Sequence, residues 1–176
     1  MNIVLIGYRG SGKSTVGRRL AARLKLRFVD TDDLIEERQG VPISDIVKCH
    51  GWGHFRKLER NTIEEISKED HLIIAPGGGA VLDTDSVDAL RKNGLIIWLK
   101  ADKPTLLKRL NQDPGTNTRR PTLTGQGTSE ELKEVVSLRE PIYERVSEIQ
   151  IDTSRIDVET VVESVLTVLK DKMRRI

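Results

Sequence analysis

Two periods of hydrophobic and polar positions alternate along the chain. Short apolar runs of strand length occur at residues 3–6, 27–29, 72–75, 95–99 and 148–151. The longer stretches between them repeat apolar residues every three or four positions, as helices do when they bury one face. This pattern is clearest in the last stretch, where apolar residues recur at Val158, Val161, Val162, Val165, Leu166 and Leu169. Asp157 precedes them, and aspartate is a residue type preferred at helix N-caps. The alternation predicts an α/β fold, in which helices cover both faces of a parallel sheet.

Composition limits the number of domains and the classes of function to expect. The 176 residues contain no internal repeat or linker, so we expect one domain. With 37% hydrophobic and 32% charged residues and a net charge of +2, no strong field marks the chain for nucleic acid or membranes. The first apolar run is too short for a signal peptide, and no run approaches the length of a membrane span. We therefore expect a cytoplasmic protein, monomeric because no interface stripe is evident, with neither nucleic acid nor membrane as a partner.

The single cysteine, Cys49, excludes an internal disulfide and fits a reducing compartment. We expect a structural or half-buried cysteine rather than a reactive thiol.

A phosphate-binding motif follows the first predicted strand. The motif G-x-x-x-x-G-K-[ST] is matched by Gly7-Tyr8-Arg9-Gly10-Ser11-Gly12-Lys13-Ser14, and a helical pattern follows at residues 16–24. Its glycines let backbone N–H groups converge on phosphate oxygens at the positive end of the helix. Lys13 can reach the β- and γ-phosphates, and the hydroxyl of Ser14 can bind Mg²⁺. The sequence therefore predicts a nucleoside triphosphate site.

Two carboxylates follow the second predicted strand at the edge of the sheet where ligands bind. Asp30 and Asp32 would share one face if the strand continued that far. One could hold Mg²⁺ through water while the other accepts a proton from a substrate hydroxyl. The alternative is that Asp30 to Asp33 are turn and helix-capping residues. A similar choice applies to Asp102, which we expect to cap the helix that starts near Pro104 rather than to bind a metal.

A glycine run, Gly77-Gly78-Gly79, follows Pro76 at the end of the third predicted strand. It leaves no side chain in the way of a ligand and offers backbone N–H groups, although a flexible turn would have the same composition.

Three arginines, Arg56, Arg120 and Arg139, lie in separate segments. Together they could clamp a carboxylate and a transferring phosphoryl group, whereas each taken alone could be a surface residue. Arg120 lies within residues 112–129, a stretch rich in Gly, Thr, Asn and Pro that we interpret as a lid over the nucleotide.

In their order and spacing these segments resemble the shikimate kinase family along nearly the whole chain. The matching motifs are Gly10-Ser11-Gly12-Lys13-Ser14-Thr15, Asp30-Thr31-Asp32, Ile43-Ser44-Asp45-Ile46, Phe55-Arg56 with Glu59, Gly77-Gly78-Gly79-Ala80, Arg120-Pro121 and Arg139-Glu140-Pro141-Ile142-Tyr143. The resemblance implies a three-layer P-loop kinase fold of the nucleoside monophosphate kinase type, with a five-stranded parallel sheet flanked by helices. It also implies one domain over residues 1–176, with a substrate-binding subdomain at about 32–60 and a lid at about 112–127.

The family transfers the γ-phosphoryl group of ATP to the 3-hydroxyl of shikimate, in the route to chorismate and the aromatic amino acids. The resemblance thus implies ATP/ADP and shikimate as partners and Mg²⁺ as cofactor. On the nucleotide side it assigns Ser14 and Asp30 to Mg²⁺, and Arg109 and Arg155 to the adenine. It assigns phosphate binding to Gly10, Ser11, Gly12, Lys13, Ser14 and Thr15.

On the acceptor side the resemblance assigns the shikimate carboxylate to Arg56 and Arg139. Asp32 would bind the hydroxyls and act as base, and Gly78 would offer its backbone. Lys13 and Arg120 would neutralise the phosphoryl group during transfer.

This chain departs from the family at Trp52, where an acidic residue is usual. Since Trp52 precedes Arg56 by four residues, a single helix would place both on one face near the substrate, whereas Trp98 in an apolar strand should be buried.

Two other functions stay open at this point. One is a kinase of another small hydroxy acid, such as gluconate. The other is a catalytically silent relative that binds nucleotide, although such a protein has no reason to keep Lys13, Ser14, Asp32 and Arg120 together.

Overall fold

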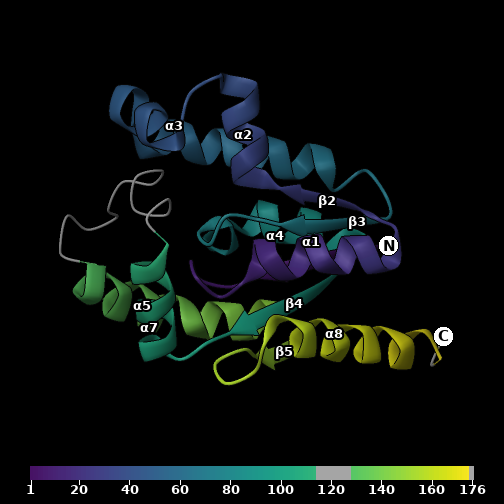
Figure 1. The fold of residues 1–176 in the computed structure, drawn as a ribbon. Helices are drawn as coiled ribbons and strands as arrows, with labels where there is room; N and C mark the ends of the chain where they lie inside the picture. The colour runs from purple at the N-terminus through teal and green to yellow at the C-terminus, as the bar shows by residue number, and fades with distance from the viewer. Residues whose placement is uncertain (114–127, 175–176) are drawn as a thin grey trace.

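Five parallel strands form one sheet at the centre of the computed structural model, which describes residues 1–113 and 128–174. The strand order is β2-β3-β1-β4-β5 (Figure 1). The strands are β1 (Asn2–Ile6), β2 (Arg27–Asp30), β3 (Leu72–Ala75), β4 (Gly94–Lys100) and β5 (Ile149–Asp152). Each predicted strand is present, with ends that differ by one residue in most cases. The five-stranded parallel sheet is therefore confirmed.

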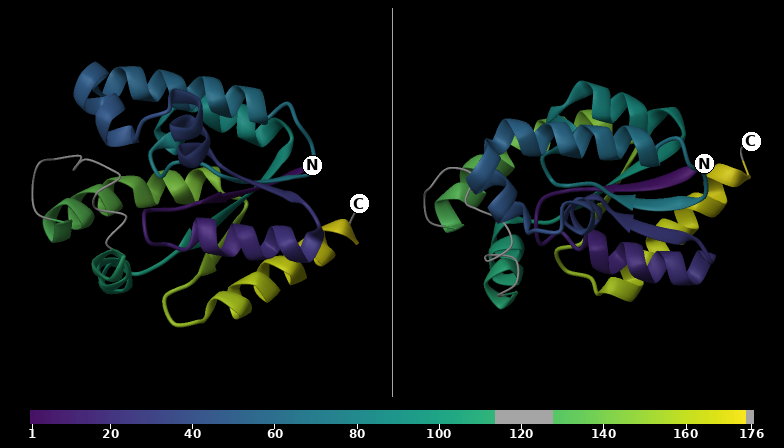
Figure 2. Two further views of the ribbon diagram at one scale, coloured as in Figure 1. Left: turned by 45° about the horizontal axis from the view of Figure 1, so that its top comes forward. Right: turned by 90° about the horizontal axis from the view of Figure 1, so that it is seen from above.

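Helices cover both faces of this sheet, as the strand and helix alternation predicts. They are α1 (Lys13–Leu24), α2 (Thr31–Gln39), α3 (Ile43–Ile66), α4 (Thr84–Lys92), α5 (Lys103–Gln112), α7 (Thr128–Val146) and α8 (Val158–Met173), with a short 3₁₀ turn, η1 (Ala80–Leu82). Because side chains of β1 point alternately to the two faces, Ile3 and Leu5 pack with α1 and α8. Val4 and Ile6 pack with α3, α4 and α7 on the opposite face, which gives the three layers seen in Figure 2.

The predicted helix caps are confirmed. Asp157 accepts a hydrogen bond of 2.8 Å from the Thr160 N–H, and Asp102 accepts one of 2.8 Å from the Thr105 N–H. These carboxylates satisfy N–H groups that have no partner within the helix.

The α2–α3 unit extends beyond β2, at the edge of the sheet (Figure 1). It has its own small apolar cluster, formed by Ile35, Ile43, Ile46 and Phe55. At Gly51 the chain has φ 82° and ψ 167°, so α3 is two helical segments joined by a sharp kink. Cys49, just before the kink, is exposed, so the expectation of a half-buried cysteine was wrong.

Within the described residues, no helix has both the length and the apolar character needed to cross a membrane.

Candidate active site

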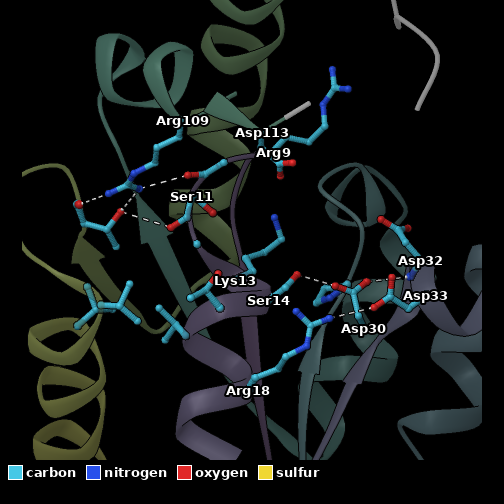
Figure 3. A pocket seen from close by; sticks show the side chains of 18 of the residues that line it. Arg9, Ser11, Lys13, Ser14, Arg18, Asp30, Asp32, Asp33, Arg109 and Asp113 are labelled. Carbon is cyan, nitrogen blue, oxygen red and sulfur yellow. Dashed lines mark hydrogen bonds and ion pairs between the residues drawn. The ribbon is translucent and has the colours of Figure 1, made fainter. Parts of the chain in front are cut away.

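A cavity of about 740 Å³ opens at the carboxyl ends of the strands (Figure 3). Its size is within the range usual for small-molecule sites. The phosphate loop forms its floor. Most residues predicted for the nucleotide and Mg²⁺ line it, together with Asp32, which was predicted for the acceptor: Gly10, Ser11, Gly12, Lys13, Ser14, Thr15, Asp30, Asp32 and Arg109. Segments far apart in the sequence are thus brought together around one space.

The phosphate loop passes directly into α1, which begins at Lys13. Gly10 and Gly12 have φ values of 78° and 96°, a left-handed conformation that glycine adopts without strain. Lys13 Nζ donates to the carbonyl oxygens of Gly7, at 2.8 Å, and Tyr8, at 3.1 Å. The ammonium group is therefore held over the loop, next to the N–H groups at the start of the helix, and this arrangement suits phosphate binding.

Ser14 and Asp30 face each other at one side of this loop. The Ser14 hydroxyl donates to Asp30 Oδ2 at 2.6 Å, while Asp30 Oδ1 accepts the N–H of Asp32 at 3.1 Å. Asp30 therefore caps α2 with one oxygen and meets Ser14 with the other, so the two interpretations of this residue are compatible.

The oxygens of Ser14 and Asp30 fit a Mg²⁺ ion. This ion usually takes one or two protein oxygens and completes its shell with water and substrate phosphates. Among the described residues, no group of three or more histidine, cysteine or carboxylate side chains is arranged to hold a metal ion.

Asp32 is carried by helix α2 rather than by an extension of strand β2. The strand ends at Asp30 and helix α2 begins at Thr31, so the strand does not continue far enough for both carboxylates to share one strand face. Asp32 lies in the first turn of α2, where it is buried and lines the cavity.

A second, smaller cavity adjoins the first, and Arg9, Asp32 and Ile43 line both. Its other lining residues are Trp52, Phe55, Arg56, Glu59, Gly77, Gly78, Gly79 and Arg139. The residues predicted for the acceptor therefore lie together, next to the phosphate loop. The free space is only about 30 Å³.

Two arginines surround a buried carboxylate in this smaller cavity. Arg56 Nη1 donates to Glu59 Oε2 at 2.6 Å, and Arg139, only 8% exposed, lies close enough to stabilise the same charge. Burial raises the pKa of Glu59, although Arg56 and Arg139 oppose that rise. Among the described residues, Glu59 Oε1 has no hydrogen-bond partner. Two guanidinium groups against one carboxylate leave an excess positive charge, which suits an anionic ligand.

The glycine run is held in place rather than flexible. Gly77 N–H donates to Thr31 Oγ1 at 3.0 Å, and the Gly78 carbonyl accepts the Tyr143 hydroxyl at 2.6 Å. A Cβ atom on Gly77 would collide with Glu59, and one on Gly79 with the Arg56 guanidinium. Tyr143 was not predicted as a site residue, although its position four residues after Arg139 places both on one face of α7.

Arg109 ties the phosphate loop to the connection between β5 and α8. It donates to the carbonyl of Gly10 at 3.2 Å, to Thr153 Oγ1 at 3.1 Å and to the Thr153 carbonyl at 2.6 Å. Thr153, which was not predicted, directly follows β5 at the ligand edge of the sheet. Arg155 is exposed and is not among the residues that line the cavity, whereas its neighbour Ile156 is.

Trp52 lies at the acceptor side, as predicted. It lines the smaller cavity, and the Arg56 guanidinium lies 5.4 Å from its ring centre. Both follow the kink at Gly51, and because they are four residues apart they share one face of the second segment of α3. Trp98 is buried in β4, also as predicted. Arg120 lies outside the described residues, and so does the predicted lid, apart from residues 112–113 and 128–129 at its two ends.

Comparisons with known proteins agree with this geometry. The sequence model of the shikimate kinase family matches residues 9–170. A shikimate kinase from Syntrophus aciditrophicus is 39% identical, over 94% of this chain and 89% of its own. One from Symbiobacterium thermophilum is 39% identical over 99% of both chains. The solved structure of shikimate kinase from Acinetobacter baumannii in complex with shikimate has a TM-score of 0.90 at 29% identity, over 97% of this chain and 93% of that one. This chain belongs to the shikimate kinase family.

Proposed function

We propose that this protein transfers the γ-phosphoryl group of ATP to the 3-hydroxyl of shikimate, which yields shikimate 3-phosphate and ADP. The observation that carries this proposal is the meeting of two cavities at Asp32. One has a phosphate loop as its floor, and the other presents Arg56 and Arg139. The Acinetobacter baumannii relative, whose structure contains shikimate, supports the choice of acceptor.

On the nucleotide side, the protein positions charge rather than forming covalent bonds, as phosphoryl transfer requires. The N–H groups from Gly10 to Thr15 bind the phosphates, and Lys13 neutralises charge at the β- and γ-phosphates. Ser14 and Asp30 would hold Mg²⁺, which supplies further neutralisation of phosphate charge when bound. Arg109 is the candidate contact for the adenine, and Arg155 stays a weaker one because it is exposed.

On the acceptor side, Arg56 and Arg139 pair with the carboxylate of shikimate, and Gly78 offers its backbone. Asp32 stands where both cavities meet, so it can orient the 3-hydroxyl and accept its proton as the oxygen attacks phosphorus. Burial at the start of α2 holds that carboxylate in one place.

Other parts of the proposal rest on the sequence alone. Arg120 would neutralise the transferring phosphoryl group from a lid at about residues 112–127, and residues of about 32–60 would act as a substrate-binding subdomain. We further propose a cytoplasmic monomer.

A coupled assay of ADP release tests the function. The purified protein is supplied with ATP and Mg²⁺, and with shikimate, with gluconate or with no acceptor. We expect release that depends on shikimate and saturates with it, and only background release in the other two reactions. Release that depends on gluconate would support the related kinase instead, and background release in all three, with ATP binding intact, would support a silent relative.

A further inference from the structure

Arg9 has no assigned role, because it occupies a variable position of the phosphate-binding motif. Among the described residues, Arg9, Asp32 and Ile43 line both cavities, and Arg9 is the only cation of these three. In the view of Figure 3, its side chain rises from the loop and points away from Ser14 and Asp30. Arg9 therefore lies between the two cavities. It is separated from Ser14 and Asp30, the candidate Mg²⁺ residues.

The Arg9 side chain is held by a buried carboxylate. Its Nη2 donates to Glu131 Oε1 at 2.7 Å, and the side chains of Arg9 and Glu131 are 15% and 2% exposed. Glu131 lies in the first turn of α7, the helix that also carries Arg139. The preceding residue, Tyr8, packs among apolar residues of α5 and α7, so the backbone next to Arg9 is also anchored. The arginine is thus fixed in place before any ligand binds.

This arrangement leaves donors available for a ligand. A guanidinium group has five N–H donors, and within the described part of the chain Arg9 uses only one nitrogen, for Glu131. Arg9 lines the junction of the two cavities together with Asp32. A purely structural role in holding the loop does not require that Arg9 line both cavities.

We propose that Arg9 is a further binding residue for the phosphoryl group, which it contacts from the acceptor side during transfer and on the product. Glu131 is its positioning residue. The inference rests on the proposed function. As the 3-oxygen of shikimate forms its bond to phosphorus, the bond from phosphorus to the oxygen bridging the β- and γ-phosphates breaks, and its electron pair leaves with ADP. Lys13 is held over the phosphate loop by the carbonyl oxygens of Gly7 and Tyr8, so Arg9 would add a positive charge to the phosphoryl group from the acceptor side.

Titration calorimetry without nucleotide tests the proposal, with shikimate and shikimate 3-phosphate as the two probes. Arg9→Met should weaken binding of shikimate 3-phosphate by about 10- to 100-fold, the loss expected for a charge-assisted contact, and change shikimate binding by less than about threefold. It should also lower kcat more than it changes KM for ATP. Arg9→Lys should restore part of the loss because it keeps the charge without the fork.

Two further variants complete the design. Glu131→Gln leaves Arg9 charged but less firmly held, so it should fall between the wild type and Arg9→Met in product affinity. Arg19→Met is the matched control and should behave as the wild type, because Arg19 is exposed, pairs with Glu159 and lines neither cavity.

Some outcomes would overturn the inference. Arg9→Met with wild-type product affinity and kcat would remove Arg9 from the site. Equal losses of shikimate and product affinity in Arg9→Met and Arg9→Lys, together with lower thermal stability, would make Arg9 a structural brace. A wild type that makes no shikimate 3-phosphate would overturn the proposed function as well, whereas a wild type that makes it beside an unimpaired Arg9→Met would overturn this inference alone.

Discussion

Arg56 and Arg139 come from different helices, yet both act on the carboxylate of Glu59 in the smaller cavity. Their positive charge exceeds that of the single carboxylate, and the excess is what a substrate carboxylate would use. Neither arginine lies in the phosphate loop. Removing one of these arginines should therefore weaken acceptor binding much more than ATP binding.

We expect Arg139→Ala to raise KM for shikimate by roughly 10- to 150-fold, corresponding to the loss of about 1.5–3 kcal/mol from one charge-assisted pair. KM for ATP should change much less. Steady-state kinetics with each substrate varied in turn measure both values. Arg145→Ala, an exposed arginine on the same helix, is the control. Unchanged acceptor kinetics in Arg139→Ala would exclude that arginine from the site.

Glu59 should make folding stability depend on pH in an unusual direction. Burial raises its pKa above the ordinary 4.5, against the effects of Arg56 and Arg139. The folded state then binds more protons than the unfolded state above that pH, so this carboxyl contributes its full stability below pH 4.5 and loses it as the pH rises through the folded pKa. Because glutamine does not titrate, Glu59→Gln does not lose stability in this way as the pH rises. Its free energy of unfolding relative to wild type should therefore increase from pH 4.5 upward, as urea denaturation can measure.

Glu65 provides an opposite control on the same helix. Hydrogen bonds from Arg38 lower the pKa of Glu65, so its contribution is present above its unfolded pKa and is lost as the pH falls. Relative to wild type, Glu65→Gln should therefore become less stable as the pH rises. The same pH trend in both variants would contradict the assignment of a raised pKa to Glu59.

The kink in α3 determines where the acceptor residues of that helix lie. Trp52, Phe55 and Arg56 all follow Gly51, whose φ of 82° and ψ of 167° belong to a region that only glycine adopts readily. A continuous helix through this point would direct the second segment elsewhere. The conformation of one glycine is thus part of the geometry of the smaller cavity.

Gly51→Ala and Gly53→Ala form a matched pair that tests this role. Gly51→Ala should cost about 1–3 kcal/mol of stability from backbone strain, and it should raise KM for shikimate more than KM for ATP. At Gly53 the backbone is helical and an added Cβ meets no atom within 4 Å, so Gly53→Ala should stabilise the helix by about 0.5–1 kcal/mol. Thermal unfolding and kinetics check both variants. Equal stability of the two would show that Gly51 is not strained by a side chain.

The elements that the sequence predicts well are those specified by local patterns. Apolar runs locate the strands, and Asp102 and Asp157 locate two helix starts, because each signal lies within a few residues of its effect. The phosphate loop is equally local. Local patterns do not specify the turn from β2 into α2 at Thr31 or the kink at Gly51. A Thr after an Asp, or a Gly among helix formers, is compatible with several backbone conformations.

The site residues that sequence reasoning missed depend on tertiary contacts. Arg9 stands at a variable position of its motif, and only the pairing with Glu131, 122 residues later, places it between the cavities. Thr153 and Tyr143 likewise meet partners from distant segments, Arg109 and Gly78. No spacing in the sequence announces such pairs, so they appear only when the whole molecule is assembled.

At the scale of the whole molecule, the smaller cavity is too tight for an acceptor to enter without some rearrangement of its walls. Its free space of about 30 Å³ suits one or two water molecules, not a six-carbon ring acid. The part able to yield is α2 with the start of α3, because Ile35, Ile43, Ile46 and Phe55 form a separate small apolar cluster. The end of α3, by contrast, packs on the sheet, which is covered on both faces. Acceptor binding should therefore move this unit or the arginines beside it.

Trp52 should report that movement, since it lies on the moving unit and lines the cavity. Trp98 is the internal reference, because it is buried in β4 and stacked on Tyr143, with ring centres 5.7 Å apart. We expect shikimate, titrated without ATP, to change tryptophan emission in the wild type with saturation and to leave emission nearly unchanged in Trp52→Phe. A saturable signal that survives in the variant would assign the change to Trp98. No signal in either protein, despite binding shown by calorimetry, would mean that the α2–α3 unit neither moves nor loses water, and that the cavity opens through the arginine side chains alone.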